Sequence, residues 1–536
     1  MVRASEINNV RSRIDSSDTD NDLQKDRNIY KVKKSRLISL VNWYHVISTS
    51  FPYIMFTLIG LFVFQFSFSL YQTRDQVKEL AIEAMTAKPQ VWFLGWQGSF
   101  ITALLVYLFA KRPAQTYLLE FCTFEAPEEW KVTHSQLMEM MRRQQCFSEE
   151  SINFLSRILD KSGTGPATAW PPSIVQCLKD GKPQNKSVEN AREESMIVIC
   201  KVIEDVLAKT KTKPRDIDIL VINCSLFSPT PSLCALAAHH FGMRSDLQSY
   251  NLAGMGCSAS VIAVDLAKDL LNARGRNGLA LVVSTENLTQ NLYLGNDRSM
   301  LLQNTLFRCG GAAMLLSNSW AHAHKAKYKL LHTLRKQGID DESYECVFEC
   351  EDENGNRGVR LSKQIVKVAG RAMEQNFTAL GPYVLPVSEI WKVAKATVAR
   401  PASKLLRAFF EKNGMTSVVA MIPLVKPYIP DFKRGIDHFC IHAGGRAVVD
   451  GVGQNLKLDD AQLEPSRHTL YHYGNTSSSS IWYELDHIRK SMNQRRGHRV
   501  LQLAFGSGFK CNSAVWLCLQ DGDNVRGAKT GKDKSA

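Results

Sequence analysis

The segment Tyr250–Ser260, with the sequence YNLAGMGCSAS, places a cysteine where it could act as a nucleophile. Cys257 follows Gly254 and Gly256 and precedes an apolar, helix-compatible stretch. Free backbone amides and the helix dipole at such a position are expected to lower the pKa of the thiol and favour the thiolate. The amides around Gly256 could also bind the oxyanion of a thioester adduct. The alternative interpretation is a buried structural cysteine in a glycine turn.

Two later segments supply residues that could assist this thiol. In His438–Asp450 (HFCIHAGGRAVVD), the predicted strand ends at His442, and glycines and a helix follow. In Tyr473–Glu484 (YGNTSSSSIWYE), Asn475 stands on a loop before another helix. A thiolate that attacks a carbonyl needs donors for the charge that develops on oxygen, and imidazole and amide groups supply them. The pattern favours covalent acyl transfer by Cys257, His442 and Asn475.

A third glycine-containing segment, Phe505–Asn512 (FGSGFKCN), is predicted to turn between two strands. Its amides could line a ligand pocket and complete an oxyanion site together with the amide of Cys257. The candidates in this turn are Gly506, Gly508 and Phe509.

Two other histidines are secondary candidates for the pocket. His438 lies on the same predicted strand as His442, where a core histidine is more usual, and His472 is expected on a loop or at the surface. Two pairs of possible ligands stand close enough in the sequence to suggest a metal, but no metal site is predicted, because no partner pair stands at zinc-site spacing from either of them. These pairs are Cys346 with Cys350 and His322 with His324.

The elements that must position these residues alternate between strand-like and helix-like stretches after residue 110. Short apolar runs between amphipathic helices are typical of an α/β sheet that is covered on both faces. We predict two similar halves, residues 111–320 and 321–520, followed by a disordered tail at 521–536. The apolar runs are Asp216–Cys224, Gly278–Thr285, Ala312–Ser317, His438–His442, Val500–Phe505 and Ala514–Leu519.

The N-terminal part has a different character. Phe51–Tyr71 and Val91–Ala110 are uncharged runs of 21 and 20 residues, which is long enough to cross a bilayer. Buried core helices are the less favoured alternative. We predict a transmembrane hairpin at 37–110. Basic residues flank both ends, so by the positive-inside rule the mobile arm 1–36 and the large C-terminal part face the cytosol.

Composition sets further bounds on function. The 536 residues are 44% hydrophobic and carry a formal net charge of +14. We find neither zinc-finger spacing nor a basic region joined to heptads, so nucleic acid is not an expected partner. The thirteen cysteines, an odd number, are scattered along a long chain that opens without a cleavable secretory signal, which argues against a disulfide framework.

These motifs resemble those of the plant 3-ketoacyl-CoA synthases of very-long-chain fatty acid elongation. The resemblance extends from the predicted hairpin to about Leu519. Besides the three segments around Cys257, His442 and Asn475, it is carried by RPAQTYLLEF (Arg112–Phe121), NCSLFSPTPSL (Asn223–Leu233), STEN (Ser284–Asn287), GNDRSMLL (Gly295–Leu302), FRCGGAAMLLSN (Phe307–Asn318) and GPYVLP (Gly381–Pro386).

The resemblance implies a thiolase-like fold with αβαβα layers, usually as a homodimer. It implies that Cys257 accepts the acyl group, with His442 and Asn475 completing the triad, and that the substrates are acyl-CoA and malonyl-CoA with no cofactor. It also implies an endoplasmic-reticulum membrane location and association with the reductases and dehydratase of a four-step elongase.

The sequence departs from the family pattern at three places. Gln337 stands near a usual histidine, Tyr471 replaces a histidine four residues before Asn475, and Ser260 replaces a glycine after the nucleophile. Three other functions remain open at this stage. They are a type III polyketide synthase, a papain-like protease, whose own signature is absent, and a catalytically inactive elongase scaffold.

Overall fold

The computed structural model describes residues 60, 63–65, 114–275, 277–415, 419, 421–423 and 428–526. The chain divides into two compact units, Met1–Arg112 and Pro113–Ala536. The predicted arm (1–36), nearly all of the predicted hairpin (37–110) and residues 527–536 of the predicted tail lie outside the described residues. None of the helices in the described ranges is both long and apolar enough to cross a membrane.

Within the described residues, the second unit contains one nine-stranded sheet with the strand order β11-β12-β13-β8-β1-β7-β6-β4-β5. The first predicted half supplies β1 (Tyr117–Thr123), β4 (Ile219–Asn223), β5 (Gln248–Leu252), β6 (Leu279–Thr285) and β7 (Gly311–Ser317). The second half supplies β8 (Tyr328–Gln337), β11 (His438–Ile441), β12 (Arg499–Gly506) and β13 (Lys510–Cys518). Each half therefore contributes one continuous side of the sheet.

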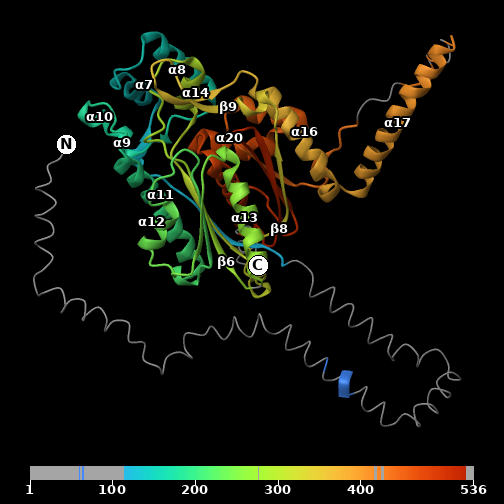
Figure 1. Ribbon diagram of the computed structural model, residues 1–536, viewed down its shortest axis with the longest axis horizontal. Helices are drawn as coiled ribbons and strands as arrows, with labels where there is room; N and C mark the ends of the chain where they lie inside the picture. Colours follow the sequence, from blue (N-terminus) through green and yellow to red (C-terminus); the bar gives the residue numbers. More distant parts are fainter. Residues whose placement is uncertain are drawn as a thin grey trace, which may run out of the picture. The chain divides into compact units, whose positions relative to one another are not determined.

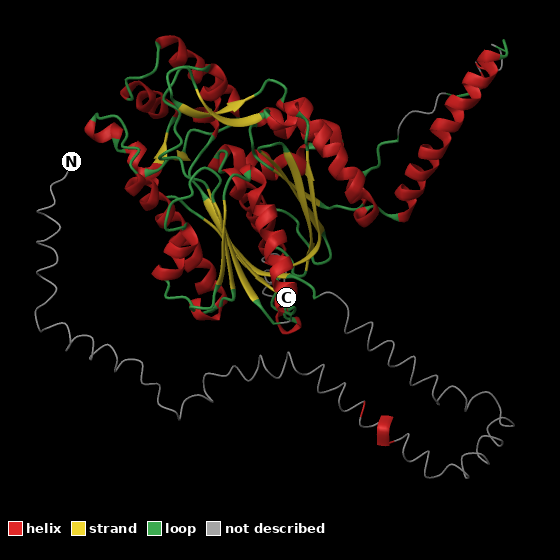
Figure 2. Ribbon diagram, viewed as in Figure 1, coloured by secondary structure: helices red, strands yellow, loops and turns green. Residues whose placement is uncertain are grey.

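Two helices, α13 (Ala259–Arg274) and α21 (Ser480–Ser491), pack against strands of both sides of the sheet. Figure 2 shows strands on either side of a central helix, and this helix is labelled α13 in Figure 1. A buried apolar cluster joins the two helices to both groups of strands. On the outside, α11 (Val188–Thr210) covers the first group, and α16 (Ile365–Val384) and α19 (Arg446–Leu456) cover the second. The predicted order of helix and strand layers is therefore observed.

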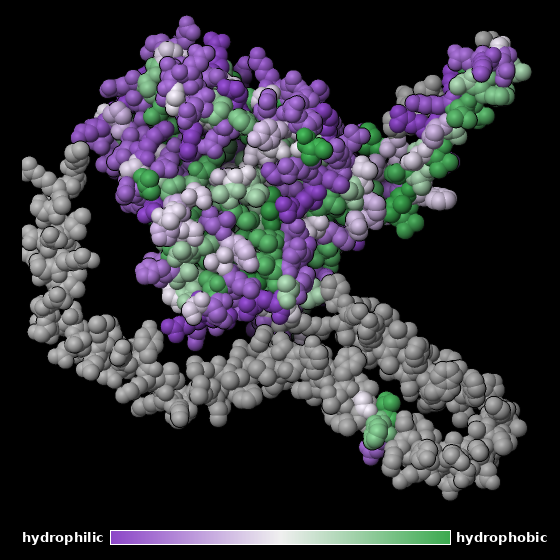
Figure 3. All heavy atoms as spheres, viewed as in Figure 1, coloured by the Kyte–Doolittle hydropathy of each residue, from purple (hydrophilic) through white to green (hydrophobic). Residues whose placement is uncertain are grey.

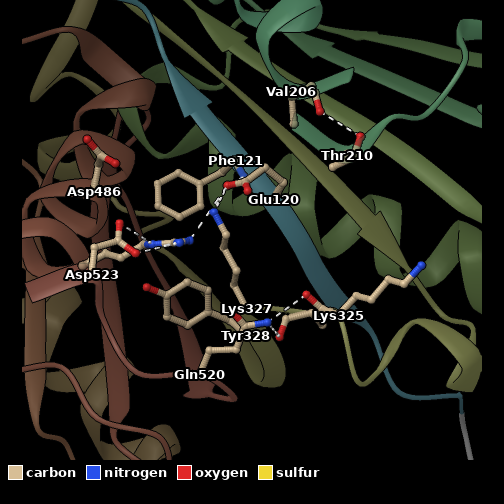
Figure 4. A network of polar contacts seen from close by, with 12 residues as sticks. Glu120, Phe121, Val206, Thr210, Lys325, Lys327, Tyr328, Asp486, Gln520 and Asp523 are labelled. Atoms are coloured by element: carbon tan, nitrogen blue, oxygen red, sulfur yellow. Dashed lines mark hydrogen bonds and ion pairs between the residues drawn. The ribbon is translucent and has the colours of Figure 1, made fainter. Parts of the chain in front are cut away.

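The two groups of strands meet where β1 pairs with β8 over only Tyr117↔Lys329 and Leu118↔Tyr328. A polar cluster, drawn in Figure 4, crosses this seam. The Lys327 ammonium contacts the Glu120 carboxylate, and Arg489 from α21 lies 4.0 Å from Glu120. Burial lowers the pKa of Lys327, and the nearby Glu120 carboxylate opposes this change. Each charge is thus compensated by another at the junction of the two halves.

Shorter elements complete the fold around this framework. In the first half they are η3 (Glu128–Trp130), β2 (Lys131–Val132), α7 (His134–Arg143), α8 (Glu149–Ser162), β3 (Thr168–Ala169), α9 (Pro172–Val175), α10 (Cys177–Asp180), η4 (Pro214–Asp216), α12 (Leu233–His240), η5 (Gly256–Ser258), α14 (Arg298–Leu306) and η6 (Trp320–His322). In the second half they are α15 (Asp341–Tyr344), β9 (Val347–Glu351), β10 (Arg357–Leu361), α17 (Val387–Lys412), η7 (Phe432–Arg434), α20 (Asp460–Tyr473) and η8 (Ser477–Ser479).

Candidate active site

Cys257 lies in the short turn η5, between the end of β5 and the start of α13. Gly256 adopts φ +67°, in the left-handed region where a side chain is strained. A Cβ atom at Gly256 would also come within 2.8 Å of Ser507 Oγ and 3.1 Å of Gly506 Cα. The glycine is therefore required both by its own backbone conformation and by the close approach of the β12–β13 turn to the nucleophile.

The β12–β13 turn comes from the second half of the chain and holds the cysteine turn in place. A Cβ atom at Gly506 would approach the Met255 carbonyl oxygen to 2.7 Å. Asn512 Nδ2 of β13 donates to Ser258 Oγ at 3.0 Å. The sequence predicted this turn correctly, and Gly508 has the expected left-handed φ of +68°. The amide of Phe509, however, donates to the Ser343 carbonyl at 2.9 Å, so it does not serve as an oxyanion donor in this conformation.

His442 follows the last residue of β11, which pairs in parallel with β12 at Ile441↔Leu503. Its amide continues that pairing and donates to the Leu503 carbonyl at 2.9 Å. The side chain is buried, and burial lowers the pKa of the imidazole to about 4. Gly444 leaves room for the ring, because a Cβ atom there would lie 3.2 Å from Nε2. Nδ1 has no hydrogen-bond partner among the described residues.

Asn475 lies between α20 and η8 and is held by both of its backbone groups. Its amide donates to the Leu306 carbonyl at 3.0 Å, and its carbonyl accepts from the Arg308 amide at 2.9 Å. Its side-chain oxygen Oδ1 accepts from the Ser477 amide at 2.9 Å. This bond commits Oδ1 as an acceptor and leaves the Nδ2 group of the buried amide as the donor to a reacting oxygen.

Contacts between neighbouring residues link the three segments that carry the predicted catalytic residues. The turn η5 packs against η8, which begins two residues after Asn475. A Cβ atom at Gly445, in the loop after His442, would lie 3.4 Å from the Leu306 side chain, and the Leu306 carbonyl binds the Asn475 amide. In the described part of the chain we find no direct hydrogen bond between any two of the three side chains.

The thiol of Cys257 is the group whose predicted electrostatics are wrong. The sequence predicted a lowered pKa at a helix N-terminus, whereas burial raises the pKa of Cys257 to about 12. A hydrogen bond with the Ser477 side chain lowers this pKa, and the negative charge of Glu286 raises it. Because desolvation penalises the anion, it outweighs the local helix end. The neutral thiol is thus the resting form, and the buried His442 imidazole is neutral as well.

Glu286 is a buried carboxyl group that the sequence analysis did not assign to the site. It accepts hydrogen bonds from the Leu226 amide at 2.9 Å and from Ser477 Oγ at 3.0 Å. Burial raises its pKa, and these bonds oppose that change. Ser477 therefore lies between the thiol and a carboxylate. The only sequence signal was an acidic residue in the apolar surroundings of STEN, together with four serines in a row after Asn475 and Thr476.

A narrow cavity is lined in part by Glu286. Phe307, which forms a β-bridge with Asn475, also contributes to its wall. The lining is mostly apolar, and four polar side chains interrupt it. The lining residues are Trp170, Leu226, Glu286, Leu288, Asn291, Leu292, Gln303, Asn304, Phe307 and Val359.

The secondary histidine candidates have partners away from the cysteine. His438 Nε2 lies 3.0 Å from His498 Nδ1, and the ring of exposed His472 lies 4.3 Å from that of His468. Both arrangements favour structural or surface roles. At two of the three positions that depart from the family pattern, the structure shows what the residue contacts. Gln337 pairs with Lys510 next to the β12–β13 turn, whereas the carbonyl of half-exposed Tyr471 accepts a hydrogen bond from the Gly165 amide.

Possible metal ligands are not grouped in this fold. Cys346 is buried in the apolar cluster under α16, and His322 Nδ1 lies 2.9 Å from Ser317 Oγ. Across the described ranges, no group of three or more His, Cys, Asp or Glu side chains could hold a metal ion.

The fold is that of the type III polyketide synthases. A fungal type III polyketide synthase, ORAS, superposes with a TM-score of 0.57 and covers 75% of this chain and 99% of its own, at 18% sequence identity. Residues 108–402 match the family described as FAE1/Type III polyketide synthase-like protein. Residues 434–519 match the C-terminal domain of chalcone and stilbene synthases.

Sequence similarity narrows this class to one family. 3-ketoacyl-CoA synthase 5 of Arabidopsis thaliana is 47% identical over 411 residues, which cover 76% of this chain and 79% of the relative. 3-ketoacyl-CoA synthase 11 of the same plant is 42% identical over 499 residues, which cover 92% of each chain. The chain belongs to the 3-ketoacyl-CoA synthase family, as the sequence motifs predicted.

Proposed function

We propose that this protein condenses a long-chain acyl-CoA with malonyl-CoA to give 3-oxoacyl-CoA, CoA and CO2, the first step of very-long-chain fatty acid elongation. Family membership over most of the chain supports this activity. The observation that supports the chemistry is the packing of the turn η5, which carries Cys257, against η8, which follows Asn475, and against β12, which pairs with the strand that ends before His442.

The first half of the proposed reaction acylates Cys257. At neutral pH both partners are uncharged, because burial raises the thiol pKa to about 12 and lowers the imidazole pKa to about 4. Proton transfer from the thiol to His442 would therefore accompany attack of sulfur on the acyl-CoA carbonyl. The carbon–sulfur bond to CoA then breaks, the CoA thiolate takes a proton from solvent, and His442 keeps the proton that it received from Cys257. The amide of Cys257, with Gly506 or Gly508 nearby, is the proposed donor to the oxyanion.

The second half forms the new carbon–carbon bond. Malonyl-CoA loses CO2, and the electron pair of the broken bond becomes an enolate. We assign His442 and the Nδ2 group of Asn475 as donors to the enolate oxygen, because the Asn475 amide is already oriented by Ser477. The enolate carbon attacks the acyl-cysteine, Cys257 leaves as the thiolate, and His442 returns the proton to it. These steps use two CoA thioesters and three side chains, and we propose no cofactor.

We assign the narrow cavity beside Glu286 to the acyl chain. Its lining offers apolar contacts from Leu288, Leu292 and Val359, which suit a hydrocarbon. It begins next to the residues that surround the nucleophile, since Glu286 contacts Ser477 and Phe307 pairs with Asn475.

The deciding experiment measures condensation and acylation separately. Membranes containing the full chain are incubated with palmitoyl- or stearoyl-CoA and labelled malonyl-CoA, and a single two-carbon extension is expected. Cys257→Ala should abolish both label transfer from acyl-CoA to protein and condensation. Asn475→Ala should still be acylated but should condense poorly. Multiple extensions would favour a polyketide synthase. Absence of any product from the full chain would favour an inactive scaffold.

We further propose that the chain is anchored in the endoplasmic-reticulum membrane by the hairpin at 37–110, with the catalytic unit in the cytosol. The two long uncharged runs and their basic flanks support this proposal. Protease protection of tagged N- and C-termini in sealed microsomes tests it, and protection of either terminus would contradict it.

Two kinds of protein partner are proposed for this chain, a second copy of itself and the other enzymes of the elongase. Among the residues that the structure describes, β5 pairs only with β4 and so lies at an edge of the sheet. An open strand edge is suited to pairing with a second copy. We therefore propose a homodimer, which light scattering of the purified protein would test. Because a 3-oxoacyl-CoA must be reduced and dehydrated before another cycle, we also propose association with the elongase reductases and dehydratase.

A further inference from the structure

Helix α17 (Val387–Lys412) exposes an apolar face that no described element covers. It extends away from the layered body in Figure 1, and Figure 3 shows hydrophobic residues along one side of it. The exposed fraction is 74% for Trp391 and 76% for Leu405. We define the α17 stripe as Val387, Trp391, Val398, Leu405 and Phe409, all of which are exposed and recur at helical spacing on one face.

The opposite face of α17 attaches the helix to the rest of the chain through polar contacts. Buried Glu389 accepts from Tyr428 Oη at 2.6 Å. Ser403 Oγ donates to the Pro423 carbonyl at 2.6 Å, and Arg407 Nη1 donates to the Ile422 carbonyl at 2.6 Å. A surface helix usually buries its apolar face and exposes its polar one. In α17 the orientation is reversed, so rotation onto the body would break these bonds.

The charge of α17 indicates what the stripe contacts. The helix carries six basic residues and two acidic ones, Glu389 and Glu411. Glu389 is already paired with Lys392 at 2.8 Å, which leaves the exposed part of the helix strongly positive. The basic residues are Lys392, Lys395, Arg400, Lys404, Arg407 and Lys412.

We propose that the α17 stripe lies in the surface of a phospholipid bilayer that contains anionic lipids. A basic amphipathic helix with tryptophan and phenylalanine on its apolar face is suited to the headgroup boundary, where basic side chains remain near phosphate. A second copy of the chain would bring six more positive charges against the first, so like-charge repulsion disfavours that occupant. The inference does not depend on the condensing activity or on the predicted hairpin.

Site-specific photocrosslinking of the full chain tests the proposal. p-Benzoylphenylalanine is placed at position 409 of the protein reconstituted in phosphatidylcholine vesicles with and without phosphatidylserine. We expect a phospholipid adduct on the peptide that contains position 409. The yield should exceed that at position 344 by about tenfold, because Tyr344 is an exposed aromatic residue of α15 outside the stripe. Phosphatidylserine should raise the yield at position 409 and leave that at position 344 unchanged.

A double variant tests whether the α17 stripe itself contacts the lipid. Val398→Glu combined with Leu405→Glu places two charges in the stripe and leaves the bonds of Ser403 and Arg407 in place. The variant should lose most of the lipid adduct at position 409, compared with the chain that lacks these two changes. Equal yields at positions 344 and 409, an unchanged adduct in the variant, or a crosslink between two copies would each overturn the proposal.

Discussion

Ser477 offers the most direct test of how the fold controls the nucleophile. Its single hydroxyl proton has two possible acceptors, the Glu286 carboxylate at 3.0 Å and the Cys257 sulfur. When the thiol is neutral, the proton can remain on the bond to Glu286. When the sulfur is ionised, the Ser477 hydroxyl can donate this proton to the thiolate only by giving up its hydrogen bond to Glu286. The two acceptors therefore compete for one proton. Substitutions at Ser477 and at Glu286 should change the pKa of the Cys257 thiol in opposite directions.

The expected sizes follow from the energy of one hydrogen bond. A bond to a charged group contributes about 1.5–3 kcal/mol, so Ser477→Ala should raise the thiol pKa by about one to two units. A more basic thiolate is also more nucleophilic, which recovers about half of the loss. Alkylation at fixed pH should then slow by about three- to tenfold. Glu286→Gln removes a nearby negative charge and frees the hydroxyl proton, and should speed alkylation by roughly threefold or more.

The assay is the rate of iodoacetamide alkylation against pH, followed by mass spectrometry on the peptide that contains Cys257. Cys146, another partly exposed thiol, provides an internal reference in the same sample. Ser478→Ala is the matched control, because the Ser478 hydroxyl contacts Asn223 and Ser284. The reasoning fails if Ser477→Ala and Glu286→Gln change the rate in the same direction, or if Ser478→Ala has an effect as large as that of Ser477→Ala.

Three further predictions concern the seam, the buried imidazole and the cavity. Glu120→Gln leaves Lys327 and Arg489 without their shared carboxylate and should lower the free energy of unfolding by about 3 kcal/mol; a chemical denaturation curve matching that of the unchanged chain would contradict this. The folded-state pKa of about 4 for His442 lies below its ordinary value of 6.5, so the unfolded chain binds more protons between these values. The contribution of His442 to the free energy of unfolding should therefore be fully present above about pH 6.5 and should fall on acidification towards pH 4, with a loss of about 2 kcal/mol near pH 5. Thermal unfolding at several pH values should show a smaller loss in His442→Gln. Val359→Trp fills the cavity beside Glu286 and should shorten the longest acyl-CoA that is extended when substrates of increasing chain length are compared. An unchanged range of products would show that the cavity does not bind the acyl chain.

The interior of the fold could be predicted from the sequence, and its margins could not. Continuous apolar runs led to β4, β6 and β11 within one to three residues at each end, because strands buried on both faces are apolar throughout. β5 was missed because its sequence QSYNL is polar and the strand is partly exposed at the edge of the sheet. β8 was missed because it mixes lysine, arginine and histidine with apolar residues, and only part of it is buried.

The catalytic candidates show the same limit in their chemistry. Residue type and local turn predicted Cys257, His442 and Asn475, since a glycine turn and a strand end are local features. The pKa of the thiol depends on how much protein surrounds it, and that environment comes from η8 and β12, far along the chain. Ser477 adopts φ +58° and contacts Glu286 through this packing alone. Nothing in a run of four serines distinguishes it from its neighbours.

The cysteine turn is held by Gly506, Ser507 and Asn512, about 250 residues further along the chain. During synthesis, the nucleophile therefore leaves the ribosome long before its support exists. Contacts so distant in sequence form late in folding. A truncated product that ends before β12 retains Cys257, His442 and Asn475. It lacks strands β12 and β13 and the turn between them, which holds Cys257 in place. A premature stop before β12 would therefore leave Cys257 without the turn that positions it.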